Sequence, residues 1–209
     1  MEEAERPGSG SSVLERAILF RDGLIIMFVA LTGTRRGALR VMRIGEHLQR
    51  REGSFEVRWS ASEMKGGRRG YRLELGHRLS ACFDRYLECH RPILLARAKS
   101  PSPGEARAVW LSERGTHLSE DGMSRQVGRR TEDAFNIAVN LHAFRQSACT
   151  TIAIEIPEHA WIATPLLQHA TGDTATQVYN LGSALEASRR VTKAIDADRF
   201  GTRRRKHGG

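Results

Sequence analysis

The feature that most limits the possible folds is a pair of short segments in which apolar and polar residues alternate. Residues 55 to 59 (Phe-Glu-Val-Arg-Trp) and residues 71 to 75 (Tyr-Arg-Leu-Glu-Leu) both follow this pattern. Alternation places the apolar side chains on one face of a β-strand, which can then pack on a core. Glycines lie between the two segments, so we predict two antiparallel strands. A third strand around residues 41 to 48 would complete a small sheet.

The remaining patterns are mainly helical. An apolar run at residues 24 to 31 is far shorter than the roughly 20 residues of a membrane span, so we predict a buried helix that Gly33 ends in a left-handed conformation. Further helices are expected from Arg35, over residues 78 to 98, and after Ser119 as an N-cap. The predicted fold class is therefore α+β: a mainly α-helical domain with a small antiparallel three-stranded sheet near the N-terminal third.

The connecting segments complete this outline. Residues 101 to 104 (Pro-Ser-Pro-Gly) predict a loop, and residues 109 to 111 (Val-Trp-Leu) predict a short extended piece. Pro157 marks a break, after which short helices should carry His169 and Tyr179.

One domain is expected from the length of 209 residues. We predict a disordered segment at residues 1 to 11, a single domain over residues 12 to 200, and a flexible basic tail at residues 201 to 209. The formal net charge of +9 indicates a polyanionic partner, nucleic acid before membrane. Three cysteines without C-x-x-C spacing are typical of reduced thiols in a cytoplasmic protein.

A set of polar residues points to phosphoryl transfer. In chain order the set comprises Arg35, Lys65, His142, Arg145, His169 and Tyr179. A tyrosine hydroxyl has a pKa of about 10 and is a poor nucleophile near neutral pH. Guanidinium groups can hold phosphate oxygens bidentately, and imidazole and ammonium groups can move protons. Each residue alone has an ordinary structural explanation; a histidine and an arginine three apart, for example, are more often structural than catalytic. The six together favour a phosphodiester-cleaving site.

The segments around these residues resemble the catalytic domain of the tyrosine recombinases, or phage integrases. Residues 32 to 35 (Thr-Gly-Thr-Arg) are similar to the T-G-x-R box, and Lys65 lies in a segment similar to the hairpin with the catalytic lysine. Residues 141 to 148 are similar to the H-x-L-R-H-T-x-A box, and residues 166 to 179 to L-L-G-H followed by T-T-x-x-Y. The boxes cover roughly residues 20 to 185.

Three positions depart from the family pattern. Ala38 stands where an acidic residue is usual, Gln146 where a histidine is common, and Gln168 where a glycine is common. None of the three is a primary catalytic group in the family.

The resemblance implies a set of roles. Tyr179 would attack a DNA phosphate and form a 3′-phosphotyrosyl bond, while Arg35, Arg145 and His169 stabilise the transition state. His142 would assist proton transfer at the nucleophile, and Lys65 would protonate the leaving 5′-oxygen. No cofactor and no metal are implied. The implied partners are double-stranded DNA and other protomers on paired DNA sites.

Two other functions stay open at this stage. A type IB topoisomerase uses nearly the same residues but religates within one duplex. A non-catalytic DNA-binding remnant is the second alternative, because relatives carry a helical core-binding domain before the catalytic one. Only 34 residues precede Arg35, so that domain is expected to be absent from this sequence.

Overall fold

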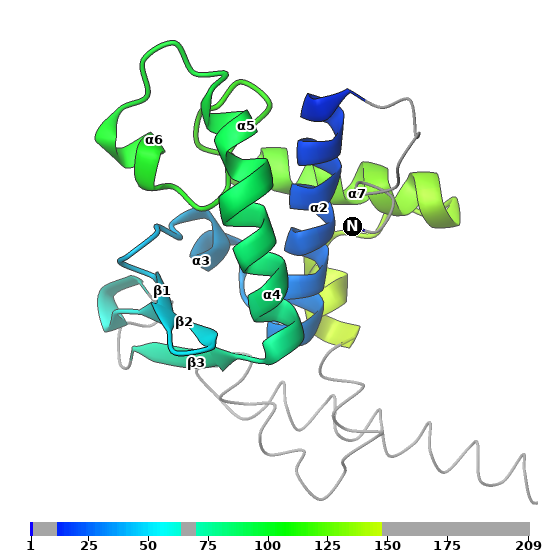
Figure 1. The fold of residues 1–209 in the computed structure, drawn as a ribbon. Helices are drawn as coiled ribbons and strands as arrows, with labels where there is room; N and C mark the ends of the chain where they lie inside the picture. Colours follow the sequence, from blue (N-terminus) through cyan, green and yellow to red (C-terminus); the bar gives the residue numbers. More distant parts are fainter. Residues whose placement is uncertain (2–11, 64–69, 148–209) are drawn as a thin grey trace, which may run out of the picture. The chain divides into compact units, whose positions relative to one another are not determined.

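The structure is a computed structural model, and it describes Met1 and residues 12 to 63 and 70 to 147. The chain divides into two compact units, Met1–Arg145 and Gln146–Gly209, and the helices and strands labelled in Figure 1 belong to the first. The predicted N-terminal segment beyond Met1, the break at Pro157, the helices expected after it and the basic tail lie outside the described residues.

The described elements follow one another in a fixed order. They are α2 Val13–Thr32, α3 Arg36–Arg40, β1 Leu48–Arg51, β2 Ser54–Trp59, a 3₁₀ turn Ala61–Glu63, β3 Tyr71–Leu75, α4 His77–Arg85, a π-helical turn Tyr86–His90, α5 Arg91–Leu95, α6 Pro103–Arg107 and α7 Glu120–Phe135. Residues 141 to 147 are also helical. This arrangement confirms the predicted α+β class.

Both ends of helix α2 are fixed by capping interactions. The Ser12 hydroxyl accepts a hydrogen bond from the Glu15 amide at 3.1 Å, and the Glu15 carboxylate accepts one from the Ser12 amide at 2.7 Å, which together form a capping box. At the other end Gly33 adopts φ 60° and its amide donates to the Val29 carbonyl at 2.8 Å. The apolar run and the predicted stop at Gly33 are both confirmed. Within the described residues, no helix is long and apolar enough to cross a membrane.

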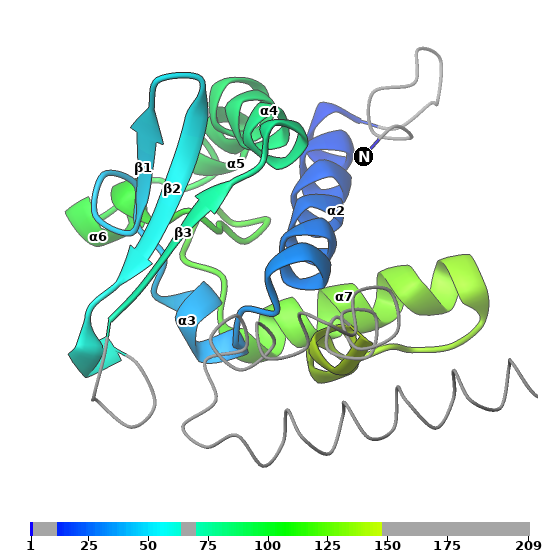
Figure 2. The same cartoon turned by 90° about the horizontal axis from the view of Figure 1, so that it is seen from below.

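The sheet contains β1, β2 and β3 side by side, with antiparallel pairing throughout (Figure 2). Val57 lies opposite Leu48 on one side and Leu73 on the other. Phe55, Val57 and Leu75 are buried, so the sheet presents one apolar face to the core. The two strands predicted from alternation are confirmed.

The position predicted for the first strand was wrong. It was expected at residues 41 to 48 and lies instead at Leu48–Arg51. The reason is a tight turn after Arg51 in which Gly53 has φ 72°. This turn pairs Arg51 with Ser54 and fixes β1 immediately before it.

A long helix supplies most of the remaining core. It runs from residue 77 to 95 through α4, the π-helical turn and α5, as predicted for residues 78 to 98, and it packs against α2 (Figure 1). Phe28 of α2 meets Phe83 of α4 edge-on, with ring centroids 5.6 Å apart. Trp110 is fully buried and lies 5.8 Å from both Phe83 and Tyr86. These rings join α2 to the long helix.

The last described elements place α7 beside the N-terminal half. Residues 101 to 104 were predicted as a loop, but Ser102 and Glu105 form a capping box that begins α6 at Pro103. The extended piece around Val109 is partly confirmed, since the residues on either side of 109 and 110 form isolated β-bridges. Ser119 caps α7 as predicted, accepting from the Gly122 amide at 3.1 Å, and α7 packs against α2 and α3.

Candidate functional site

The turn between α2 and α3 carries Arg35 and is held by two threonines. The Thr32 hydroxyl donates to the Phe28 carbonyl at 2.7 Å and lies 2.7 Å from the Thr34 hydroxyl. The Thr34 amide also donates to the Thr32 hydroxyl, at 3.3 Å. Both threonines are buried, so the turn has a fixed internal network and Arg35 leaves it as the N-cap residue of α3.

The Arg35 guanidinium is partly buried and unsatisfied. Its Nη1 atom is buried and has no hydrogen-bond partner among the described residues, and burial lowers the pKa of Arg35 from its ordinary value. A buried donor without a partner costs about 1–3 kcal/mol. An anion bound at this position would supply the missing acceptor.

Arg145 reaches the same turn from the far end of the described chain. It lies in the helical residues 141 to 147, is 6% exposed, and its Nη1 atom donates to the carbonyl of Gly33. The fold thus brings the Arg145 guanidinium to the turn from which Arg35 projects. No local sequence pattern joins the two residues.

His142 shares a helix with Arg145, as predicted, but its environment differs. Leu141 is buried at 5% exposure and anchors the start of this helix, whereas His142 is exposed. The prediction that His142 and Arg145 reach one phosphate together stays a prediction. Lys65, His169 and Tyr179 lie outside the described residues, so the structure neither brings them to Arg35 nor separates them from it.

Tyr86 is another of the three tyrosines of the chain, and its surroundings exclude it as a nucleophile. Tyr86 is fully buried in the core, and its hydroxyl donates to the Val109 carbonyl at 3.0 Å. Burial raises the pKa of Tyr86 to about 12. A hydroxyl that is buried, bonded and harder to deprotonate than usual cannot attack DNA, so Tyr86 is a structural residue.

Ala38, which stands where the family usually has an acidic residue, is a packing residue in this structure. Ala38 is 7% exposed, and its carbonyl accepts a hydrogen bond from the Trp59 indole at 3.0 Å. Acidic charge near this turn comes instead from Glu120 of α7, whose carboxylate pairs with Arg36 at 3.0 Å and Arg40 at 3.4 Å. These two arginines share one carboxylate, whereas Arg35 forms no ion pair within the described part of the chain.

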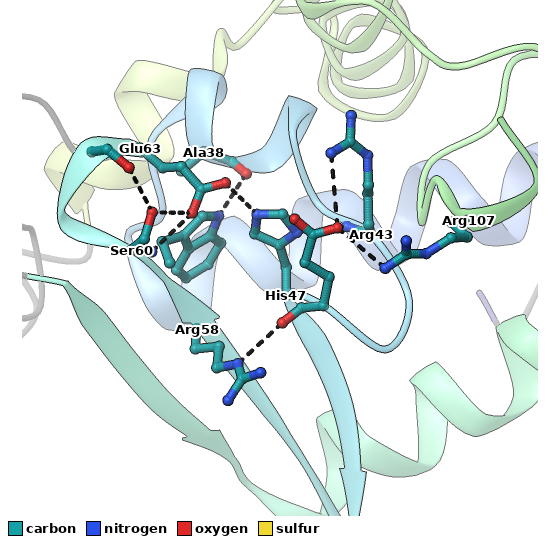
Figure 3. Close-up of polar contacts among 10 residues, drawn as sticks. Ala38, Arg43, His47, Arg58, Ser60, Glu63 and Arg107 are labelled. Carbon is teal, nitrogen blue, oxygen red and sulfur yellow. Dashed lines mark hydrogen bonds and ion pairs between the residues drawn. The ribbon is translucent and has the colours of Figure 1, made fainter. Parts of the chain in front are cut away.

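The sequence analysis did not predict the contact between the buried His47 and Glu63, which lies near the sheet. The Nε2 atom of His47 lies 2.6 Å from a Glu63 carboxylate oxygen (Figure 3). Among the described residues, Glu46, His47 and Glu63 form a group whose potential ligand atoms lie within 4.8 Å of one another. The His47 Nδ1 atom already accepts from the Arg43 amide at 3.2 Å, so the imidazole has no lone pair left for a metal ion. No sequence signal marked this pair.

Comparisons with known proteins bear on the fold. No model of a known protein family matches this chain, and no curated protein matches it. Among solved structures it is similar to the XerH site-specific recombinase bound to a palindromic difH substrate after cleavage, at 18% identity and TM-score 0.62, over 93% of this chain and 49% of that one.

Two further structures agree. The pre-cleavage complex of XerH with difH matches at 18% identity and TM-score 0.60, over 86% of this chain and 46% of that chain. The XerA recombinase matches at 17% identity and TM-score 0.58, over 84% of this chain and 60% of that one. This chain therefore spans about half the length of the XerH chains.

These likenesses define a recombinase-like fold. More particularly, the chain has the fold of the tyrosine recombinase catalytic domain, which confirms the resemblance found in the sequence motifs. At such low identity the comparison extends to the fold alone.

Proposed function

We propose that this chain is the catalytic part of a site-specific DNA recombinase that cleaves and rejoins DNA through a 3′-phosphotyrosyl intermediate. The observation that carries the proposal is the meeting of Arg145 with the Arg35 turn, in a fold shared with XerH and XerA. The Arg145 guanidinium contacts the turn that carries Arg35, and the Arg35 Nη1 atom is buried without an acceptor in the described residues.

The reaction follows from the groups in the set. The Tyr179 oxygen attacks the phosphorus and forms a new P–O bond, and the bond to the 5′-oxygen breaks. Lys65 supplies the proton that the leaving oxygen needs, and His142 assists removal of the tyrosine proton. The phosphodiester energy is kept in the protein–DNA bond, so a DNA 5′-hydroxyl can reverse the step and rejoin a strand.

The arginines have an electrostatic role. The pentacoordinate transition state carries more negative charge on its non-bridging oxygens than the substrate does. Removal of one preorganised donor that points at such a charge slows the reaction by about 10²- to 10³-fold. Arg35, Arg145 and His169 are proposed for this role, and the Gly33 contact would hold Arg145 in place without reorganisation.

Double-stranded DNA and further protomers are the proposed partners. The XerH structures are complexes with their difH substrate, and the net charge of +9 suits a polyanion. Strand exchange requires two cleaved duplexes, so protomers on paired sites would be needed to complete the reaction.

Suicide DNA substrates test the proposal. A nicked duplex that loses the short strand after cleavage traps the covalent adduct, and peptide mapping then identifies the attached residue. We expect the adduct on Tyr179, its loss in Tyr179→Phe and its retention in Tyr71→Phe, which removes the same oxygen elsewhere. The absence of any adduct would support a non-catalytic DNA-binding protein. Adduct formation with relaxation of supercoils and no strand exchange would favour the topoisomerase alternative.

A further inference from the structure

Four half-exposed arginines follow one another around α3. Arg36 and Arg40 are one helical turn apart on α3, and Arg43 comes three residues after Arg40. Arg107 of α6 lies beside Arg43, because the Ile44 amide donates to the Arg107 carbonyl at 2.7 Å. The four side chains are 48% to 55% exposed. Together they form a surface that we call the arginine row: Arg36, Arg40, Arg43 and Arg107.

The arginine row contains more guanidinium groups than carboxylates. Glu120 pairs with both arginines of α3, at 3.0 and 3.4 Å. Glu46 pairs with the other two, at 3.2 Å to Arg107 and 3.8 Å to Arg43 (Figure 3). Each carboxylate is thus shared between two arginines, and the row keeps an excess of positive charge at the surface.

A comparable group on the sheet has the opposite balance. Arg50 of β1 pairs with Asp84 and with Glu88, so two carboxylates there surround one guanidinium. No positive charge is left over at Arg50. The excess at the arginine row is therefore a local property of the surface around α3 and not a property of every exposed arginine.

Helix α3 is held in place by contacts that do not involve these guanidinium groups. Leu39 is fully buried. The Trp59 indole donates to the Ala38 carbonyl at 3.0 Å, and the His117 imidazole donates to the Arg40 carbonyl at 2.6 Å. Exposed ion pairs, by contrast, contribute only about 0–1 kcal/mol to folding. The pairs with Glu46 and Glu120 can therefore open without loosening α3.

The phosphates of duplex DNA can replace the shared carboxylates as partners. Guanidinium groups bind phosphate oxygens bidentately and stay charged at any working pH. Duplex DNA carries one negative charge per about 1.7 Å of its axis, so neighbouring arginines can each meet a phosphate. Glu120 keeps a favourable environment when its arginines leave, because it is the first residue of α7 and a helix N-terminus stabilises negative charge.

We propose that the arginine row binds the phosphate backbone of duplex DNA, and that Glu46 and Glu120 are internal counter-ions that the phosphates displace. The inference rests on the proposed function in taking duplex DNA as the partner. Because Arg36 directly follows Arg35, the row extends the phosphate contacts beyond the scissile position. An arginine that serves only in a structural ion pair loses its role when either partner is removed, whereas a displaceable counter-ion opposes DNA binding.

The salt dependence of DNA binding tests the arginines. The full 209-residue chain is titrated into a fluorescent duplex of arbitrary sequence at several salt concentrations, and anisotropy gives the affinity. Each phosphate contact contributes about 0.9 to the slope of log K against log salt. Arg40→Gln and Arg107→Gln should therefore each reduce the slope by about one. Arg50→Gln is the matched control and should leave the slope unchanged.

The carboxylates should give an effect of the opposite sign. Glu120→Gln and Glu46→Gln release two arginines each, so we expect tighter DNA binding by up to about fivefold, since the ion pairs that they break are weak. If the pairs served only to hold the fold, loss of the carboxylate and loss of the arginine would weaken binding alike. Thermal unfolding of each variant checks the fold.

The outcomes distinguish this inference from the function on which it rests. If the wild-type chain binds DNA but Arg40→Gln and Arg107→Gln keep the slope of the Arg50→Gln control, the arginine row does not contact DNA and the proposed function stands. Weaker binding by Glu120→Gln and Glu46→Gln would overturn the counter-ion role in the same way. A wild-type chain without affinity for duplex DNA at low salt overturns the proposed function, and this inference with it.

Discussion

Two arginine sites in this molecule differ in how their charge is compensated. Arg21 is 1% exposed, and its guanidinium donates twice to the Asp22 carboxylate and once to the Leu111 carbonyl. Arg130 of α7 completes the network with a 3.0 Å bond to the other Asp22 oxygen. Arg35 is also partly buried, but in the described chain it meets no carboxylate and its Nη1 has no acceptor.

The difference separates a structural arginine from a candidate ligand-binding one. In the first site the protein supplies every acceptor, so nothing remains for a ligand and the network joins α2 to α7. In the second site the protein supplies a fixed turn, a second guanidinium at Gly33 and an unused donor. A site arranged this way is less favourable for folding alone and more favourable when an anion binds.

The largest expected effect on stability is at the compensated site. Asp22→Asn would leave the Arg21 charge buried and unpaired, which costs about 3–5 kcal/mol. Urea denaturation should show this loss in the free energy of unfolding. Glu120→Gln is the matched control, since it changes an exposed pair worth about 0–1 kcal/mol. Equal effects for the two variants would mean that burial does not distinguish these ion pairs.

A smaller stability effect with a larger functional effect is expected at the Arg35 turn. Thr32→Val removes the hydroxyl that bonds Phe28 and Thr34, at a cost of about 1–3 kcal/mol in the free energy of unfolding. Adduct formation should fall by about 10²-fold, because a displaced Arg35 no longer meets the phosphate. Full activity in a Thr32→Val variant that is measurably destabilised would show that the Thr32 hydrogen bonds are not needed to position Arg35 for catalysis.

The pH dependence of stability should carry a small contribution from Glu63. Desolvation by itself would raise its pKa, but the hydrogen bonds from Ser60 and His47 lower it to about 2 in the folded chain, against an ordinary value of 4.5. The folded state therefore gains stability that is fully present above about pH 4.5 and is lost as the pH falls toward 2. The wild-type minus Glu63→Gln difference in unfolding free energy, measured by urea titration from pH 6 to pH 2.5, should shrink in acid. A difference that stays constant would show that Glu63 is not stabilised in its ionised form.

The smallest expected effect is that of metal removal. If guanidinium groups supply the charge that magnesium supplies in other phosphoryl transfers, adduct formation in excess chelator should match that in magnesium at equal ionic strength. A strict requirement for a divalent ion would contradict the arginine-based account.

Local chemistry explains which parts of the fold could be predicted from the sequence. Gly33 and Ser119 were predicted as a helix stop and a helix cap, because φ tolerance and capping depend on a few adjacent residues. The first strand was misplaced because the Gly53 turn was overlooked, and α6 was missed because the Ser102 capping box was taken for a loop.

Long-range contacts explain what could not be predicted. The six candidate site residues came from a resemblance in motif order, and the contact that brings Arg145 to the turn before Arg35 depends on packing that no periodicity encodes. The bond from Arg145 to Gly33 joins residues 112 apart. His47 and Glu63 are 16 residues apart on either side of two strands, so their pairing depends on the register of β1 and β2.

The most direct test removes the charge from each partner of the proposed contact, which are Arg35 and the scissile phosphate. Arg35→Ala should slow adduct formation on an ordinary suicide substrate by about 10²- to 10³-fold. On a substrate whose scissile phosphate is replaced by a neutral methylphosphonate, there is less charge for Arg35 to stabilise. The account predicts that Arg35→Ala and wild type then react at similar rates. An equal deficit on both substrates would contradict the claim that the Arg35 turn holds the scissile phosphate.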